Sequence, residues 1–182
     1  MARRAQPPPS THRTHLPAVL ARSLLVSALM AGPVACTRHP AAPAGEAVVV
    51  RAVDGDTIDV HVGGHPERVR LLGIDTPETV KPDTPVQCWG PEASARAKHL
   101  LPPGTRVLLV RDQEARDRYG RLLTYVWRER DRLFVNASLV AGGYARTLSI
   151  EPNTARRAQL GALEAEARAH RRGLWGSCPL PP

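Results

Sequence analysis

Three short hydrophobic segments, separated by turn residues, occupy the stretch from residue 47 to residue 73. In the second segment Ile58, Val60 and Val62 alternate with polar neighbours, a period that buries one face of a strand. The dipeptides between the segments are typical of tight hairpins. We therefore predict an antiparallel meander, with turns at Asp54-Gly55 and Gly63-Gly64 and strands at 47–53, 56–62 and 67–73.

The rest of the chain adds strands and helices, and their order limits the folds that the chain can adopt. After a loop from Thr79 to Gly90, residues 91–101 open with Pro-Glu and are rich in alanine, which favours a helix. Apolar runs predict strands at 105–111 and 121–127, with a charged loop at 112–120. Helices should follow from Asn136 as N-cap to Gly142 and from Asn153 or Thr154 to Arg172. This order predicts a mainly β, α+β fold: a five-stranded Greek-key barrel of the OB type with three packed helices.

The N-terminal region is typical of a targeting segment. A basic, proline-rich start precedes the apolar run Leu24–Ala31, which is too short to span a bilayer comfortably. Pro33-Val-Ala-Cys36 resembles a bacterial lipoprotein cleavage box, although leucine is usual where Pro33 stands, so lipidation of Cys36 with membrane anchoring and ordinary secretion both stay open. We expect an exported protein with a signal peptide at 1–35, a tether at 36–45, a domain at 46–178 and a tail at 179–182.

Charge and cysteine content agree with an exported single domain. The formal charge is +8, but Arg3, Arg4, Arg13 and Arg22 lie in the targeting segment, so the remainder is only mildly basic. Such a balance is compatible with a polyanionic partner and does not prove one. Apart from Cys36, the cysteines are Cys88 and Cys178, either a disulfide in an oxidising compartment or two unrelated thiols. Nothing in the sequence demands more than a monomer.

The stretch from Arg70 to Glu78 carries the chemistry. A buried strand leads into an acidic turn, so Arg70, Asp75 and Glu78 should project from a rigid support. Carboxylates suit a hard divalent cation, a guanidinium suits a phosphodiester, and a carboxylate can act as base towards water. A strand that merely ends in a solvated acidic turn is the alternative.

Four separated pieces of sequence together resemble the staphylococcal nuclease family, the thermonucleases, over about residues 46–176. They are Val53-Asp-Gly-Asp-Thr57, Arg70-Leu-Leu-Gly-Ile-Asp-Thr-Pro-Glu78, Gly90-Pro-Glu-Ala-Ser94 and Asp117-Arg-Tyr-Gly-Arg-Leu-Leu-Thr-Tyr125. The resemblance implies an OB-fold enzyme that uses Ca²⁺ to hydrolyse phosphodiester bonds of DNA and RNA.

The resemblance also implies a role for individual residues. Arg70 and Arg121 would hold the scissile phosphate, and Glu78 would be the general base. Arg118 and Tyr119 would contact the substrate. The calcium ligands would be the carboxylates of Asp56 and Asp75 and the carbonyl of Thr76, with Asp54 acting from further out or through water.

Two points of the sequence leave room for other outcomes. The family's best-known member flanks the bound base with two tyrosines, whereas here Arg146-Thr-Leu-Ser-Ile150 contains none and only Tyr144 lies nearby. A non-catalytic OB module that binds nucleic acid or another polyanion of the cell envelope is the alternative function. The presence of Glu78 favours the enzyme, because its charge would repel the ligand of a mere binding module.

Overall fold

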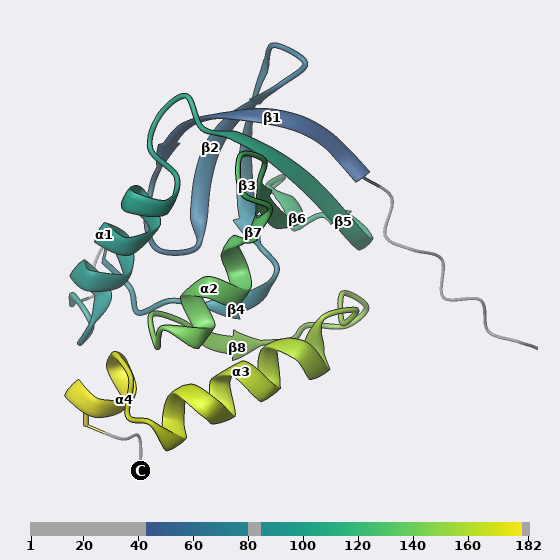
Figure 1. Cartoon of the computed structure of the whole chain (residues 1–182). Coiled ribbons are helices and arrows are strands. Elements are labelled where there is room, and N and C mark those ends of the chain that lie inside the picture. Colours follow the sequence, from purple (N-terminus) through teal and green to yellow (C-terminus); the bar gives the residue numbers. More distant parts are fainter. Residues whose placement is uncertain (1–42, 80–84, 180–182) are drawn as a thin grey trace, which may run out of the picture. The chain divides into compact units, whose positions relative to one another are not determined.

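The predicted meander forms the first part of a barrel in the computed structural model, which describes residues 43–79 and 85–179 (Figure 1). The strands β1 (Pro43–Ala52), β2 (Thr57–Val62) and β3 (His65–Leu71) pair in antiparallel fashion, with Val49 opposite Val60 and Ile58 opposite Val69. β1 begins before residue 46, the predicted start of the domain, because its first residues pair with β5. The predicted signal peptide, most of the tether, Cys36 and all but the first residue of the tail lie outside the described residues.

Two further strands close the barrel. β5 (Arg106–Arg116) pairs with β1 and with β6 (Leu122–Arg128), in both cases antiparallel. β6 also pairs with β3 in parallel, which joins the two ends of the sheet. The short strand β7 (Leu133–Phe134) extends β6. The barrel is therefore the five-stranded OB-type barrel that the sequence predicts, although β5 takes up part of the predicted loop 112–120.

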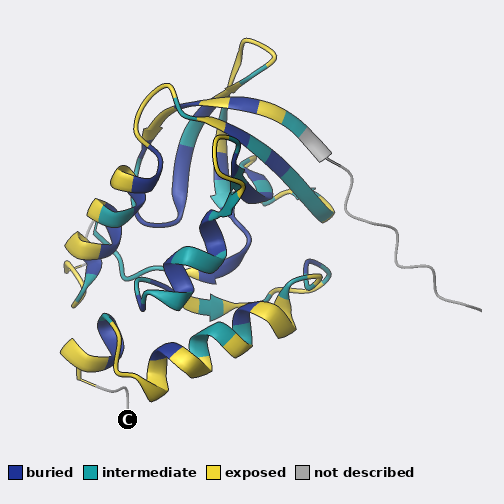
Figure 2. Ribbon diagram, in the orientation of Figure 1, coloured by how far each residue is buried: buried dark blue, intermediate teal, exposed yellow. Residues whose placement is uncertain are grey.

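Buried and more exposed residues alternate along the strands of the barrel (Figure 2). Val60 and Val69 are completely buried, and their neighbours along each strand are more exposed, as a sheet with one covered face requires. The same interior includes residues from all five strands: Val49, Ile58, Leu71, Val107, Leu109 and Val126. This packed core supplies the rigid support for the strand ends that carry the candidate site.

The chain bends sharply after β3, where the sequence predicts a strand continuing to residue 73. Gly73 has a φ of 76°, and a Cβ at this position would lie 2.6 Å from the side chain of Leu160. The bend starts β4 (Gly73–Asp75), which pairs with β8 (Arg146–Leu148) in a separate two-stranded sheet. The strand prediction was therefore wrong at its end, and the bend carries Asp75 away from the barrel.

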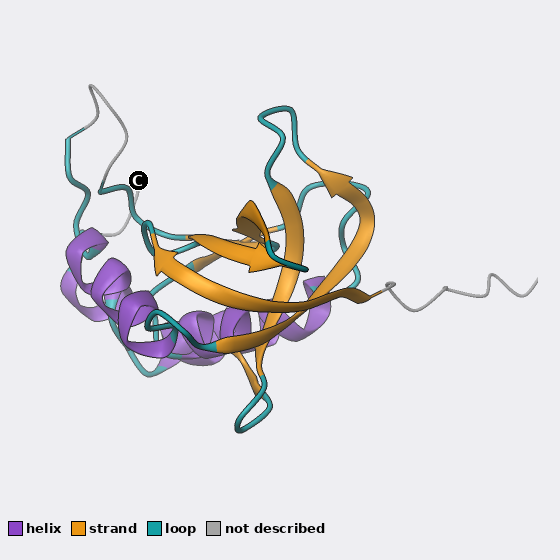
Figure 3. Cartoon of the chain, turned by 90° about the horizontal axis from the view of Figure 1, so that it is seen from above, coloured by secondary structure: helices purple, strands orange, loops and turns teal. Residues whose placement is uncertain are grey.

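The helices gather on one side of the barrel (Figures 1 and 3). The three predicted helices are confirmed as α1 (Gly90–Leu100), α2 (Val135–Ala141) and α3 (Arg157–Ala169), and a single-turn helix, α4 (Leu174–Ser177), follows them. None of the helices in the described part of the chain is long and apolar enough to cross a membrane.

Asn136, predicted as an N-cap, and Asn153, predicted with Thr154 as the start of the last helix, have other roles. Asn136 lies inside α2, fully buried, where its Oδ1 accepts a hydrogen bond from Val126 N at 2.9 Å and its Nδ2 donates to Leu72 O at 2.8 Å. The Oδ1 of Asn153 accepts from the backbone N–H groups of Gln113 and Glu114 at 2.9 Å each. The cap prediction for Asn136 was wrong, and α3 begins at Arg157 rather than at 153 or 154, because tertiary contacts bring buried or strand-end backbone groups to these amides.

A disulfide joins Cys88, just before α1, to Cys178, just after α4. The predicted pairing is therefore confirmed. Trp89 and Trp175 pack beside it, with Ala167 and Leu174, in a small hydrophobic cluster apart from the barrel core. The bridge attaches the C-terminal turn to the segment that leads into the first helix.

Candidate active site

Arg70, at the end of β3, lies at the centre of the candidate site. Its Nη1 donates to the carbonyl oxygens of Leu71 and Ile74, both at 2.8 Å, and so spans the bend between β3 and β4. Its Nη2 contacts Asp75 Oδ1 at 3.0 Å and Asp56 Oδ2 at 3.1 Å. One guanidinium thus brings together a carboxylate from the turn before β2 and one from the end of β4, both predicted from the sequence as calcium ligands.

The turn between β1 and β2 presses against the turn after β4. Asp54 Oδ1 accepts hydrogen bonds from the backbone N–H groups of Asp56 and Thr57, at 3.0 and 2.7 Å, and so shapes the first turn. Thr76 N donates to Asp56 Oδ2 at 3.0 Å, and Asp56 is only 6% exposed. A Cβ at Gly55 would lie 2.6 Å from Thr76 Oγ1, so only glycine lets the two turns meet this closely.

Crowding of the carboxylates affects their protonation. Burial raises the pKa of Asp54 above its ordinary value, and the negative charge of Asp56 raises it further. Burial also raises the pKa of Asp75, as do the charges of Asp56 and Glu78, while Arg70 opposes them. The carboxylates therefore repel one another in a partly desolvated space, and a bound cation would relieve that repulsion.

Glu78 follows β4 and is held by Gln87. The backbone N–H of Glu78 donates to Gln87 Oε1 at 3.0 Å, and Gln87 N donates to the Glu78 carbonyl at 2.9 Å. Glu78 Oε1 also accepts from Thr79 N at 2.9 Å. Gln87 thus fixes the backbone of Glu78, while Thr79 N contacts its carboxylate, and no pattern in the sequence marks Gln87 for this role.

The loop between β5 and β6 carries Arg118, Tyr119 and Arg121, and Asp117 organises it. Asp117 Oδ1 accepts from the N–H groups of Tyr119 and Arg121, at 2.9 and 3.0 Å, while its Oδ2 accepts from Arg121 Nε at 2.7 Å. Partial burial alone would raise the pKa of Asp117, but the hydrogen bonds from Arg121 and Tyr119 outweigh it and lower this pKa. Tyr119 is 69% exposed, with the guanidinium of Arg118 4.8 Å from its ring centroid.

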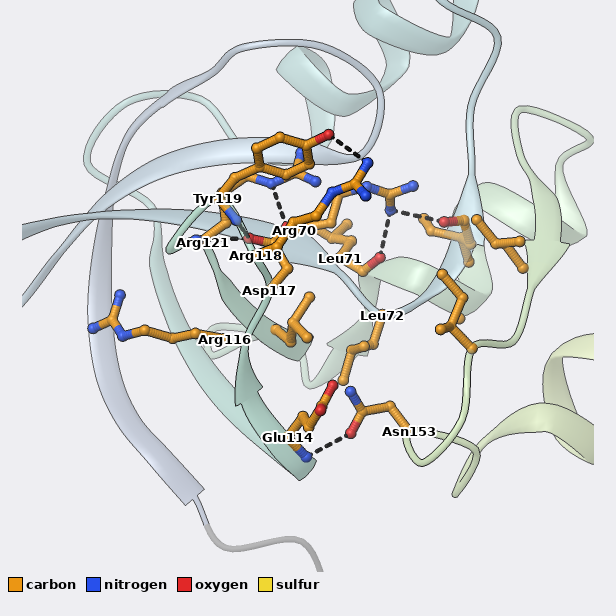
Figure 4. Close-up of a pocket in the computed structure, with 15 residues that line it drawn as sticks. Arg70, Leu71, Leu72, Glu114, Arg116, Asp117, Arg118, Tyr119, Arg121 and Asn153 are labelled. Atoms are coloured by element: carbon orange, nitrogen blue, oxygen red, sulfur yellow. Dashed lines mark hydrogen bonds and ion pairs between the residues drawn. The ribbon is translucent and has the colours of Figure 1, made fainter.

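A cavity of about 590 Å³ joins this loop to the bend after β3 (Figure 4). Arg70, Arg118, Tyr119 and Arg121 gather at one end of it, and Glu114 and Asn153 lie at the other. The predicted residues thus form two groups, with the acids on one side of Arg70 and the loop residues on the other. Arg70 belongs to both, because it contacts Asp56 and Asp75 and also lines the cavity.

Several residues that line the cavity were not predicted. Leu148 and Ile150 come from the stretch that lacks the family's tyrosines, and both are exposed. Arg116 pairs with Glu67 at 2.6 Å. No local pattern marks these residues, since β5, β8 and the segment before α3 meet only in the folded chain. Tyr144 instead packs near Trp89, with their ring centroids 6.4 Å apart.

Barrel and site together define a class: an α+β protein of the OB type, with clustered carboxylates and an arginine-lined cavity beside its barrel. A family model described as staphylococcal nuclease homologue matches residues 68–177. The chain therefore belongs to the staphylococcal nuclease family, and the resemblance stated from the motifs is confirmed.

Individual relatives cover most of the chain. A protein named thermonuclease from Staphylococcus intermedius is 45% identical over 133 residues, which are 72% of this chain and 77% of the relative. A thermonuclease from Staphylococcus hyicus is 39% identical over 129 residues, 71% of this chain and 75% of the relative. Endonuclease YncB of Bacillus subtilis (strain 168) is 42% identical over 126 residues, 69% of this chain and 59% of the relative.

Proposed function

We propose that this protein is a calcium-dependent nuclease that hydrolyses phosphodiester bonds of DNA or RNA. Family membership and the relatives named thermonuclease or endonuclease support nuclease activity. The observation that carries the proposal is the double role of Arg70, which contacts the two carboxylates and lines the same cavity as Arg121. A phosphate in that cavity would lie next to the arginine that contacts Asp56 and Asp75.

The residues present fit a calcium ion by the chemistry of their donors. Asp56 and Asp75 supply carboxylate oxygens, the ligands a hard cation prefers, that converge on one nitrogen of Arg70, and the backbone N–H of Thr76 holds Asp56 Oδ2 at 3.0 Å. In the described part of the chain, no three His, Cys, Asp or Glu side chains form a metal-binding group. So few charged ligands agree with weak binding, on the order of 0.1–1 mM. When bound, the ion would supply positive charge to a phosphoryl oxygen.

Arg70 and Arg121 would bind the phosphate and meet the charge that develops on it. Two guanidinium groups in a partly dry cavity stabilise such charge more than they could in water. The contact from Arg121 Nε to Asp117 fixes the plane of that guanidinium before substrate arrives. Arg118 and Tyr119 lie at the same end of the cavity and would contact the neighbouring nucleotide.

Glu78 would take the proton from the attacking water. Its hydrogen bonds to Gln87 and Thr79 fix its backbone and one carboxylate oxygen. A positioned carboxylate base typically contributes about 10²- to 10⁴-fold to the rate.

Cleavage of closed circular plasmid tests the proposal, because a circle has no ends for an exonuclease. The purified protein should cut it with calcium and stop with a chelator. Glu78→Gln should keep substrate binding and lose about 100-fold or more in kcat, while Glu92→Gln, at an exposed position on α1, should not. Binding without calcium-dependent cleavage would instead support the non-catalytic module.

Arg121→Lys tests the phosphate contact separately. Lysine keeps the charge but cannot reproduce the guanidinium fork or its bond to Asp117, so we expect a loss in kcat of about 100-fold. An unchanged kcat would remove Arg121 from the mechanism.

We further propose that the protein is exported. The disulfide supports this, because such bonds persist mainly in oxidising compartments. Cell fractionation should find the protein outside the cytoplasm, and replacing Cys36 with serine should release it from membranes if that cysteine carries a lipid. A cytoplasmic protein with reduced thiols would contradict the proposal.

A further inference from the structure

The segment between β4 and α1 contains a clamp on the candidate base. Two hydrogen bonds join Glu78 to Gln87: the side chain of Gln87 accepts from Glu78 N, and Gln87 N donates to Glu78 O. These two bonds tie the backbone of Glu78 to Gln87, nine residues further along the chain.

Close packing of Gly90 supports the same arrangement. A Cβ at Gly90 would lie 2.7 Å from Thr79 Cγ2 and 2.9 Å from the Glu78 carbonyl oxygen. Gly90 N also donates to Gln87 O at 3.0 Å. The first residue of α1 thus presses directly on the backbone of residues 77–79, and any shift of the start of α1 would move Glu78.

The disulfide fixes this start of α1 to the C-terminal turn. Cys88 follows Gln87 directly and is bonded to Cys178. The C-terminal turn is itself anchored, because Leu174 N donates to Gly143 O at 2.9 Å and Trp175 is buried beneath Arg168, whose guanidinium lies 4.0 Å from the ring centroid. The bond therefore connects Gln87 to a well-packed part of the fold.

Gln87 lies beside Asp75 in the wall of a second cavity. It has a volume of about 250 Å³, and Asp75, Thr76, Gln87 and both cysteines line it. The disulfide and Gln87 therefore share a cavity with Asp75.

We propose that Gln87 is a positioning residue for Glu78 and that the Cys88–Cys178 disulfide holds Gln87 in place, so that hydrolysis depends on an intact disulfide. The inference rests on the proposed function, in which Glu78 is the base. Because displacement of a catalytic group by about 1 Å can cost about 100-fold, loss of the clamp should lower kcat more than it raises KM.

Variants of Gln87 provide the first test. Gln87→Met keeps the length of the side chain and removes the acceptor, so kcat should fall about 10- to 100-fold while KM for nucleic acid stays within about twofold. Gln87→Glu restores an acceptor and should recover most of the loss. Gln159→Met, at an exposed position on α3, is the matched control and should behave as wild type. Equal effects of both methionine variants would overturn the proposal.

Removal of the disulfide provides the second test. The double variant Cys88→Ser and Cys178→Ser should lose kcat in the same range, and adding Gln87→Met should cost little more, because both changes release one clamp. Dithiothreitol, which converts the disulfide to two thiols and is itself oxidised to a cyclic disulfide, should slow the wild type and leave the serine variant unchanged. Full additivity would overturn the proposal. If the serine variant does not fold, dithiothreitol treatment of the folded wild type and of Gln87→Met decides: reduction should slow the wild type and slow Gln87→Met little further.

Amide hydrogen exchange tests the clamp independently of the proposed nuclease activity. Reduction of the disulfide should speed amide exchange at Glu78 and Thr79, whose N–H groups donate to Gln87 Oε1 and Glu78 Oε1, and leave the central residues of β5 unchanged. This readout needs no activity, so a wild type that fails to cleave nucleic acid would end the proposed function without deciding the clamp. Unchanged exchange at Glu78 and Thr79 would overturn the clamp.

Discussion

Replacement of Asn136 by leucine should strongly destabilise the protein, because one side chain satisfies two buried backbone groups. The side chain of Asn136 is completely buried and bridges two backbone groups, Val126 N in β6 and Leu72 O at the bend after β3. Leucine is similar in size but offers neither donor nor acceptor, so both backbone groups would lose their partners inside the protein.

The magnitude follows from these two groups. An unsatisfied buried hydrogen-bonding group costs about 1–3 kcal/mol, so Asn136→Leu should lower the free energy of unfolding by about 2–6 kcal/mol. Domains of this size are stable by about 5–15 kcal/mol, so the variant should lose a large share of its stability.

Urea unfolding followed by tryptophan fluorescence measures the effect. With a slope of about 1–3 kcal/mol per molar urea, the midpoint should fall by about 1 M or more while the slope stays the same. Gln159→Leu, the same change at an exposed position on α3, should stay within about 0.5 kcal/mol of wild type. A loss below about 1 kcal/mol for Asn136→Leu would refute the reasoning.

Three other predictions concern the site. Gly55→Ala should lower kcat or calcium affinity about tenfold or more, because its Cβ would displace Thr76 from Asp56, and calcium titration of activity will show it. Because the folded protein lowers the pKa of Asp117, its carboxylate stabilises the fold at pH values above its ordinary pKa of 3.8, and this stabilisation is lost as the pH falls through the folded pKa. Asp117→Asn should therefore be less stable than wild type at neutral pH and approach its stability below about pH 4. A stability difference between the two proteins that stays the same at every pH would contradict this. Calcium at about 10 mM should raise the melting temperature, and no shift would argue against the site.

The strands and the disulfide could largely be predicted from the sequence. Alternation in β2 and the turn residues around it are local signals, and they gave the meander with errors only at its ends. The motifs named the residues that Arg70 brings together, since Asp56 and Asp75 each follow an identifiable strand or turn. Their roles in binding and catalysis stay predictions until the experiments above are done.

What the sequence by itself determined is the set of buried faces and turns, because the period of hydrophobic residues depends only on the local geometry of a strand or helix. The tertiary structure alone decided which polar groups meet. Asn136 became a link between β6 and the bend rather than a cap, and Gln87 became the partner of Glu78. A buried backbone group forms a hydrogen bond with whichever donor or acceptor the packed fold brings to it, and no local sequence pattern predicts which residue that will be.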